Sequence, residues 1–199
     1  MYHIWTHANG NENLFRDDEN YRHFLDRYAK HVHPVVETFA YCLMPNHLHL
    51  MVRVREEAEV LEYLRIKRQE PDLQGFENLG GLGKVISQQF SNLFNAYTKA
   101  YNNKYGRRGS LFSPNFKRKH VDTVEYYTKL IVYIHNNPIH HGFAKKPADW
   151  LYSSWHAYNR MNQKTNISRG EGFDWFGGIE IFDFLHAHLK TGELITIFE

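Results

Sequence analysis

The chain has a single cysteine among its 199 residues, so it cannot form an internal disulfide bond. A zinc site closed by several thiolates is excluded for the same reason. Cys42 itself falls within an apolar run, which favours a buried thiol over a reactive one. We therefore do not expect cysteine chemistry to carry the function.

Long apolar runs are also missing. No stretch of about 18 apolar residues is present, and the N-terminus has no basic segment followed by an apolar one. The sequence thus predicts neither a membrane span nor a secretion signal, and we expect a cytoplasmic protein. A mass of 23.7 kDa suits one compact domain with an appendage.

Acidic residues are absent from one long stretch of the chain. Residues 78–121 contain eight Lys or Arg and no Asp or Glu, whereas the remainder has 16 basic and 22 acidic residues. Aromatic residues are interleaved, and this mixture suits a nucleic-acid backbone and base stacking. Most of these aromatics follow helical spacing, so we expect them in the core. The predicted phosphate contacts are Arg107, Arg108, Lys117, Arg118 and Lys119.

His47 and His49 lie in residues 44–55 (MPNHLHLMVRVR), where polar and apolar residues alternate from His47 to Arg55 except at Met51. Alternation places both imidazoles on one face of a strand, where they supply most of a metal site. The opposite, core-facing side consists of Leu48, Leu50, Val52 and Val54. A chain with 14 histidines contains about one His-x-His by chance, so the strand context matters. The pairs at 31/33 and 186/188 lie in helix-like segments, where the two rings diverge.

Residues 122–138 (DTVEYYTKLIVYIHNNP) are predicted to form a helix. Asp122 and Glu125 have the spacing of a capping box, and Pro138 is expected to end the helix. The face predicted to be buried consists of Val124, Tyr127, Ile131 and Ile134. A second face consists of Tyr126, Lys129, Tyr133 and Asn137. This second face combines phenol, ammonium and carboxamide groups, which indicates a functional site.

The expected fold class is α+β. The pattern predicts a ferredoxin-like (RRM-like) antiparallel sheet with helices, followed by the tyrosine-bearing helix. Besides the strand with the two histidines, the predicted strands are residues 2–7, 35–44 and 116–121, and the predicted helices are residues 17–32 and 84–104. Residues 56–83 are expected to contain a flexible connection or a substrate-contacting loop.

The chain is predicted to divide into three parts. Residues 1–158 form the functional domain, residues 159–172 are a polar linker, and residues 173–199 form a small helical appendage. Nothing in the appendage indicates catalysis.

Three motifs resemble the single-tyrosine HUH transposases, the small insertion-sequence and REP-associated tyrosine transposases. They are residues 44–49 (MPNHLH), 105–112 (YGRRGSLF) and 133–142 (YIHNNPIHHG). The resemblance implies an HUH single-tyrosine transposase domain that cleaves and rejoins single-stranded DNA with a hairpin. It also implies that His47, His49 and Asn137 bind a divalent metal, Mg²⁺ or Mn²⁺. Tyr133 would then form a 5′-phosphotyrosine link, and family members are monomers or homodimers.

Several assignments stay open at this point. His120 and His135 compete with Asn137 as the third metal ligand, although His135 points away from Tyr133. Tyr126 and Tyr127 compete with Tyr133 as the nucleophile. Lys129, one turn before Tyr133, is expected to supply positive potential and to contact DNA.

Two other functions also stay open. A non-catalytic single-stranded nucleic-acid-binding module would have the same sheet and charges, but it needs neither the tyrosine nor the strand histidines. A metal-dependent hydrolase of small substrates would use the histidines, but it leaves the acid-free stretch without a role. DNA transposition is the leading prediction.

Overall fold

The computed structural model describes residues 1–68 and 81–189. Its elements along the chain are β1 (Tyr2–His7), α1 (Asp18–His31), β2 (Val36–Leu43), β3 (His47–Val54), α2 (Glu57–Arg68), α3 (Gly81–Tyr105), β4 (Lys117–His120), α4 (Val124–His140), the 3-10 helix η2 (Pro147–Asp149), α5 (Trp155–Asn159), α6 (Arg169–Phe176) and α7 (Ile179–His188). The mixed α and β architecture agrees with the predicted class.

Within the described residues, four strands form one sheet in the order β2-β3-β1-β4. Every neighbouring pair of strands is antiparallel. Trp5 on β1 lies opposite His49 on one side and opposite Lys117 on the other. Directly opposite residues project from the same face of a sheet, so this register decides which side chains meet.

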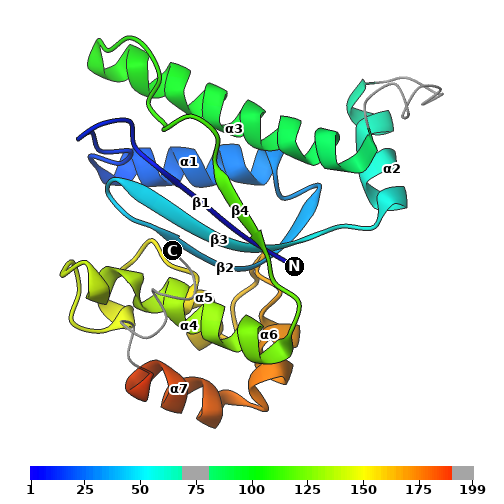
Figure 1. Ribbon diagram of the computed structural model, residues 1–199, viewed down its shortest axis with the longest axis vertical. Coiled ribbons are helices and arrows are strands. Elements are labelled where there is room, and N and C mark those ends of the chain that lie inside the picture. The colour runs from blue at the N-terminus through cyan, green and yellow to red at the C-terminus, as the bar shows by residue number, and fades with distance from the viewer. Residues whose placement is uncertain (69–80, 190–199) are drawn as a thin grey trace.

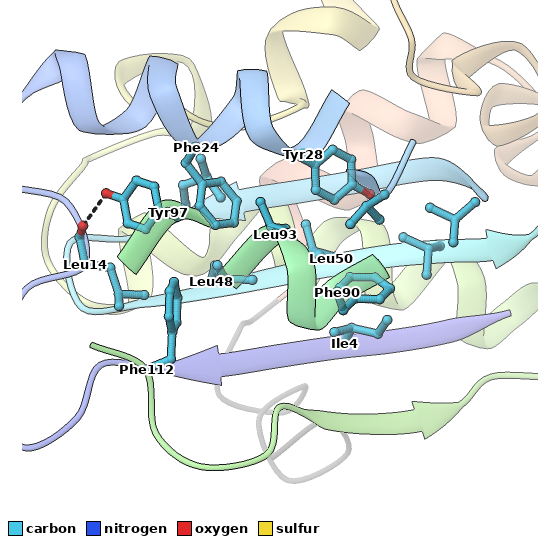
Figure 2. Packing of buried hydrophobic residues seen from close by; sticks show 14 of the residues in the cluster. Ile4, Leu14, Phe24, Tyr28, Leu48, Leu50, Phe90, Leu93, Tyr97 and Phe112 are labelled. Atoms are coloured by element: carbon cyan, nitrogen blue, oxygen red, sulfur yellow. Dashed lines mark hydrogen bonds between the residues drawn. The ribbon is translucent and has the colours of Figure 1, made fainter. Parts of the chain in front are cut away.

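Helices cover both faces of the sheet (Figure 1): α1 and α3 lie on one face, and α4 and the C-terminal helices lie on the other. Figure 2 shows the core on the α1–α3 side, where Leu48 and Leu50 of β3 pack with aromatic side chains. Phe24 and Tyr97 pack edge to face at 5.3 Å, and the Tyr97 hydroxyl donates to the Leu14 carbonyl at 2.5 Å. Burying each large apolar side chain stabilises the fold by roughly 1.5–3 kcal/mol.

The N-terminal half follows the predicted pattern closely. β1 spans the predicted residues, and α1 begins after Asp17, whose carboxylate accepts from the Asn20 amide at 2.9 Å. β2 and β3 form the predicted antiparallel hairpin. Cys42 is buried, as expected. In the predicted loop region 56–83, α2 occupies the first part, and residues 69–80 lie outside the described residues.

The prediction was wrong at both ends of α4. The N-cap is Thr123 rather than Asp122, and the Thr123 hydroxyl accepts from the Tyr126 amide at 3.3 Å. Pro138 does not end the helix, which continues to His140, because a proline near the end removes only one backbone hydrogen bond. The helix stops where Gly142 adopts a left-handed φ of 73°.

The predicted buried face of α4 is only partly correct. Ile131 and Ile134 are buried, but Val124 is 50% exposed. Every residue from 130 to 138 is buried, because α4 lies between the sheet and the pair α6 and α7. A single apolar stripe cannot describe a helix that is covered on both sides.

The C-terminal helices are held against the sheet by polar contacts. The Ser168 amide donates to the Thr38 carbonyl at 2.9 Å, and Arg53 pairs with Glu37 at 2.6 Å and with Glu171 at 2.7 Å. α6 begins at Arg169, inside the stretch predicted as a linker, and α7 belongs to the predicted appendage. Residues 190–199 of that appendage lie outside the described part of the chain. None of the described helices is long and apolar enough to cross a bilayer.

Candidate functional site

His47, His49, Tyr133 and Asn137 come together where α4 packs across one face of the sheet. The Nε2 atom of His47 lies 2.9 Å from the Oδ1 atom of Asn137. The Tyr133 ring meets the His49 ring edge-on, with 5.4 Å between centroids. The two imidazoles lie 5.3 Å apart at an angle of 87°. The fold thus gathers these four predicted residues into one cluster, which we call the histidine–tyrosine cluster.

The Nδ1 atoms of His47 and His49 each lie within hydrogen-bond distance of a polar neighbour. His47 Nδ1 lies 2.8 Å from Asn46 Oδ1, and His49 Nδ1 lies 2.9 Å from His3 Nε2 on β1. Within the described residues no group hydrogen-bonds to His49 Nε2, although this atom is buried. Buried polar atoms normally have a partner, so this nitrogen is a candidate ligand atom.

The cluster is closed to solvent. His47 and His49 are 2% and 1% exposed, and Tyr133 and Asn137 are fully buried. Burial lowers the pKa of His49 well below its ordinary value, and the neighbouring histidines add to this shift. Burial also lowers the pKa of His3 to about 3, with a smaller contribution from Lys119. The imidazoles of His49 and His3 are therefore neutral near pH 7, the form in which a ring nitrogen can bind a metal.

The donor set of the cluster fits a divalent metal. His47 Nε2 and Asn137 Oδ1 are 2.9 Å apart, close to the separation of adjacent ligands that each lie about 2.1 Å from one ion. Across residues 1–68 and 81–189, no group of three or more His, Cys, Asp or Glu side chains is arranged to hold a metal. Two imidazoles and one carboxamide leave coordination positions open, and they suit Mn²⁺ or Mg²⁺ better than a structural zinc ion.

The two competing histidines lie elsewhere. His135 Nδ1 lies 2.9 Å from His186 Nε2, and His135 Nε2 lies 2.8 Å from Ser154 Oγ, so both nitrogens are occupied. His120 is exposed on β4, with its ring 5.3 Å from that of Tyr2. Asn137 is therefore the candidate third ligand that the fold brings to the strand histidines.

The three candidate tyrosines have different surroundings. Tyr133 contacts His49 and also meets the His3 ring edge-on at 6.1 Å. Tyr126 is partly exposed, and the Lys119 ammonium lies 5.7 Å from the centre of its ring. Tyr127 packs against Trp175 at 4.9 Å. Of these three tyrosines, Tyr133 is therefore the one whose ring contacts lie beside the candidate metal ligands.

Two of the cations predicted to contact DNA are engaged in ion pairs. Lys129 Nζ lies 2.6 Å from the Glu125 carboxylate, one turn earlier on α4. The Arg107 guanidinium binds the Glu12 carboxylate and donates to the carbonyls of Gly109 and Ser110. Arg107 thereby holds the loop that follows α3. Arg108, its neighbour, is exposed.

The cations of β4 point to two different faces of the sheet. Lys117 and Lys119 lie opposite Trp5 and His3, so they share a face with the histidine–tyrosine cluster. Arg118 lies opposite Ile4 and lines a cavity of ≈ 260 Å³ on the α3 side. All three side chains are exposed on this outer strand. Lys117 and Lys119 therefore form a positive rim beside the cluster.

The sequence reasoning missed four residues at the cluster. They are His3 and Asn46, which hold the imidazoles, and His7 and His141, whose rings lie 5.1 Å and 4.7 Å from His47. One signal was present, because His3, Trp5 and His7 alternate along β1 as the histidines do along β3. That alternation predicted a strand but not which neighbour it would pair with.

No protein-family model matches this sequence, and no curated protein matches it. Among solved structures, that of a REP-associated tyrosine transposase bound to a REP hairpin is similar, with a TM-score of 0.53 and 17% sequence identity. The similarity covers 83% of this chain and 82% of that chain. At this level of identity the likeness concerns the fold alone.

Proposed function

We propose that this protein is a metal-dependent DNA transposase that cleaves and rejoins hairpin-bearing single-stranded DNA through a 5′-phosphotyrosine intermediate. The observation that carries the proposal is the meeting of His47, His49 and Asn137 with Tyr133 at their edge. The likeness in fold to a hairpin-bound tyrosine transposase supports the same class of reaction. The strand order β2-β3-β1-β4 fits a ferredoxin-like split βαβ arrangement.

In the proposed reaction, the Tyr133 hydroxyl oxygen attacks the phosphorus of the scissile phosphodiester. A P–O bond forms to the tyrosine, and the bond from phosphorus to the 3′ oxygen breaks. The 3′ oxygen leaves with the electron pair and takes up a proton, while the phenol loses one. Because one phosphodiester replaces another, a free 3′-hydroxyl can attack the phosphotyrosine and rejoin a strand.

The chain's own residues would bind and orient the substrate. A phenol is a weak nucleophile near neutral pH, and a divalent ion held by His47, His49 and Asn137 would supply polarisation of the phosphate. Tyr133 and Asn137 are one turn apart on α4, so the helix sets the position of the attacking oxygen relative to the phosphate. Lys117 and Lys119 would bind neighbouring phosphates along β4.

The cluster must open before a strand can react, because Tyr133 and Asn137 have no exposed surface. Exposed groups border it on one side, namely His7, His141 and Lys117. We place the entry of the scissile phosphate at the exposed side formed by these three groups. The burial of Tyr133 is also the observation that favours the second candidate function, a non-catalytic module that only binds single-stranded nucleic acid.

Detection of a covalent adduct separates the two candidates. The full chain is incubated with Mn²⁺ and a library of labelled single-stranded oligonucleotides that each contain a hairpin, and the products are separated under denaturing conditions. The transposase proposal predicts a retarded protein–DNA adduct that maps to the peptide containing Tyr133. Tyr133→Phe should abolish the adduct, whereas Tyr126→Phe, on the same helix, should retain it. Strand binding without any adduct in the wild type would support the binding module instead.

A further inference from the structure

His3 is fully buried on β1, and its Nε2 atom lies 2.9 Å from His49 Nδ1. It reaches His49 diagonally across the sheet, since its direct neighbour on β3 is Met51. The His3 ring is stacked on Trp5 at 4.6 Å and meets Tyr133 edge-on at 6.1 Å. A ring packed on these sides holds its nitrogen at a defined position relative to His49.

The hydrogen bond between His3 and His49 restricts where the protons lie. A neutral imidazole carries one proton, and only its other nitrogen has a lone pair in the ring plane. If His49 Nε2 is to bind a metal, the His49 proton must be on Nδ1, which then donates to His3 Nε2. His3 must in turn carry its own proton on Nδ1. The contact at 2.9 Å is therefore the hydrogen bond that a metal-binding His49 requires.

His47 has the same arrangement with a different partner. Its Nδ1 atom lies 2.8 Å from Asn46 Oδ1, and a carboxamide oxygen can only accept a hydrogen bond. Its Nε2 atom lies 2.9 Å from a second carboxamide oxygen, Asn137 Oδ1, and a neutral imidazole can donate to only one of the two. If His47 Nε2 is to bind a metal, the proton must be on Nδ1 and donate to Asn46, and Nε2 and Asn137 Oδ1 then both present lone pairs, as two ligands of one cation do. Metal binding through Nε2 thus requires the same tautomer in both histidines, with one acceptor from β1 and one from the β2–β3 turn.

We propose that His3 and Asn46 are positioning residues that keep His49 and His47 in the tautomer and orientation in which both present Nε2 to one divalent cation. This inference rests on the proposed function, because it requires the metal site. It assigns a role to two residues outside the ligand set. Outer hydrogen-bond partners of metal-binding histidines typically contribute about 10- to 100-fold in metal affinity.

Substitution of His3 separates the hydrogen bond from the packing. His3→Phe keeps an aromatic ring between Trp5 and Tyr133 but removes the acceptor nitrogen. His3→Gln instead supplies a side-chain oxygen that can accept from His49 Nδ1. Calorimetric titration of the full chain with MnCl₂ alone, without DNA, measures the effect. We expect His3→Phe to weaken Mn²⁺ binding about 10- to 100-fold and His3→Gln to recover most of the loss. His120→Phe, on the exposed β4 strand, is the matched control and should bind as the wild type does.

Asn46 provides a second test that does not disturb the core. Asn46 is exposed, and its backbone carbonyl, which accepts from the Ala8 amide at 2.7 Å, is unchanged in Asn46→Ala. We expect Asn46→Ala to weaken Mn²⁺ binding by a similar factor, and Asn46→Asp, which keeps an acceptor oxygen, to retain it. This pair tests the positioning of His47 by Asn46 even if thermal unfolding shows that His3→Phe does not fold.

The possible failures are distinguishable. Equal Mn²⁺ affinity of the wild type, His3→Phe and Asn46→Ala would overturn the positioning role while leaving the metal site intact. A His3→Gln variant as weak as His3→Phe would overturn the acceptor role of His3. A wild-type chain that binds no Mn²⁺ would refute the metal site of the proposed function, and the positioning role with it.

Discussion

The imidazole of His47 and the carboxamide of Asn137 meet at 2.9 Å although 90 positions separate them in the chain. His47 belongs to β3 and Asn137 to the end of α4, which packs against β2 and β3. Their meeting depends on α4 crossing the face of the sheet from which His47 and His49 project. The histidine–tyrosine cluster is thus a product of tertiary packing.

Removal of either strand histidine should abolish metal binding and cleavage but spare DNA binding. His47→Ala and His49→Ala each delete one nitrogen ligand, so Mn²⁺ affinity should fall by more than the roughly 100-fold upper range for an outer hydrogen-bond partner. Calorimetry with MnCl₂ measures the metal, and fluorescence anisotropy of a labelled hairpin oligonucleotide measures the DNA. Metal binding that is identical in the wild type and both variants would show that the assignment is wrong.

The lysines of β4 should make DNA affinity depend on salt. Lys117 and Lys119 share the face of the cluster, so replacing both with Ala should lower the slope of log affinity against log salt by about 1.4, or roughly 0.7 for each lost contact with a single strand. Arg118→Ala is the matched control, because Arg118 belongs to the same strand but faces α3. An equal effect of Arg118→Ala would place the DNA on the opposite face.

The two glycines of α6 should respond differently to a methyl group. A Cβ on Gly172 would overlap the hydroxyl oxygen of Tyr158, which is buried and donates to the Phe39 carbonyl at 3.0 Å. Gly172→Ala should therefore destabilise the protein by about 1–3 kcal/mol. Gly170→Ala is the control, since a Cβ there meets no atom of the described residues within 4 Å. Denaturant unfolding would compare them, and equal stabilities would contradict the packing of α6 against Tyr158.

Asp17 should stabilise the fold in a pH-dependent way. Its carboxylate caps α1 and accepts from Lys104 Nζ at 2.8 Å, and chiefly this contact lowers the pKa of Asp17 to about 2. A carboxylate with a lowered pKa contributes fully above about pH 4, and the contribution disappears as the pH falls towards 2. Asp17→Ala should cost about 1 kcal/mol at pH 7 through loss of the cap.

Asp17→Asn keeps a capping oxygen and loses only the charge, so it should cost less than Asp17→Ala at pH 7. Unfolding curves of the wild type and Asp17→Asn, recorded from pH 7 to pH 2, provide the measurement. Their difference in stability should shrink as Asp17 becomes protonated. A difference that is unchanged at pH 2 would rule out the pairing of Asp17 with Lys104.

Local patterns in the sequence were sufficient to predict many of the strands and helices. The alternation of residues 44–55 correctly predicted a strand with Leu48 and Leu50 facing the core and with both histidines on the other face. Asp17 correctly predicted the start of α1. Such features are encoded by neighbouring residues, because strand periodicity and helix capping involve contacts only a few positions apart.

Contacts between distant segments decided the rest. The helix face that carries Tyr133 and Asn137 is as buried as the predicted core face, because the sheet and the C-terminal helices enclose α4 from both sides. The charge pattern suggested that Arg107 was available to DNA, yet Glu12, 95 positions earlier, binds it. His3 belongs to the site only because β1 lies between β3 and β4 in the sheet. The sequence by itself determined which side chains each element presents, and only the tertiary structure decided which of them meet, because periodicity describes one element and partners are chosen by packing.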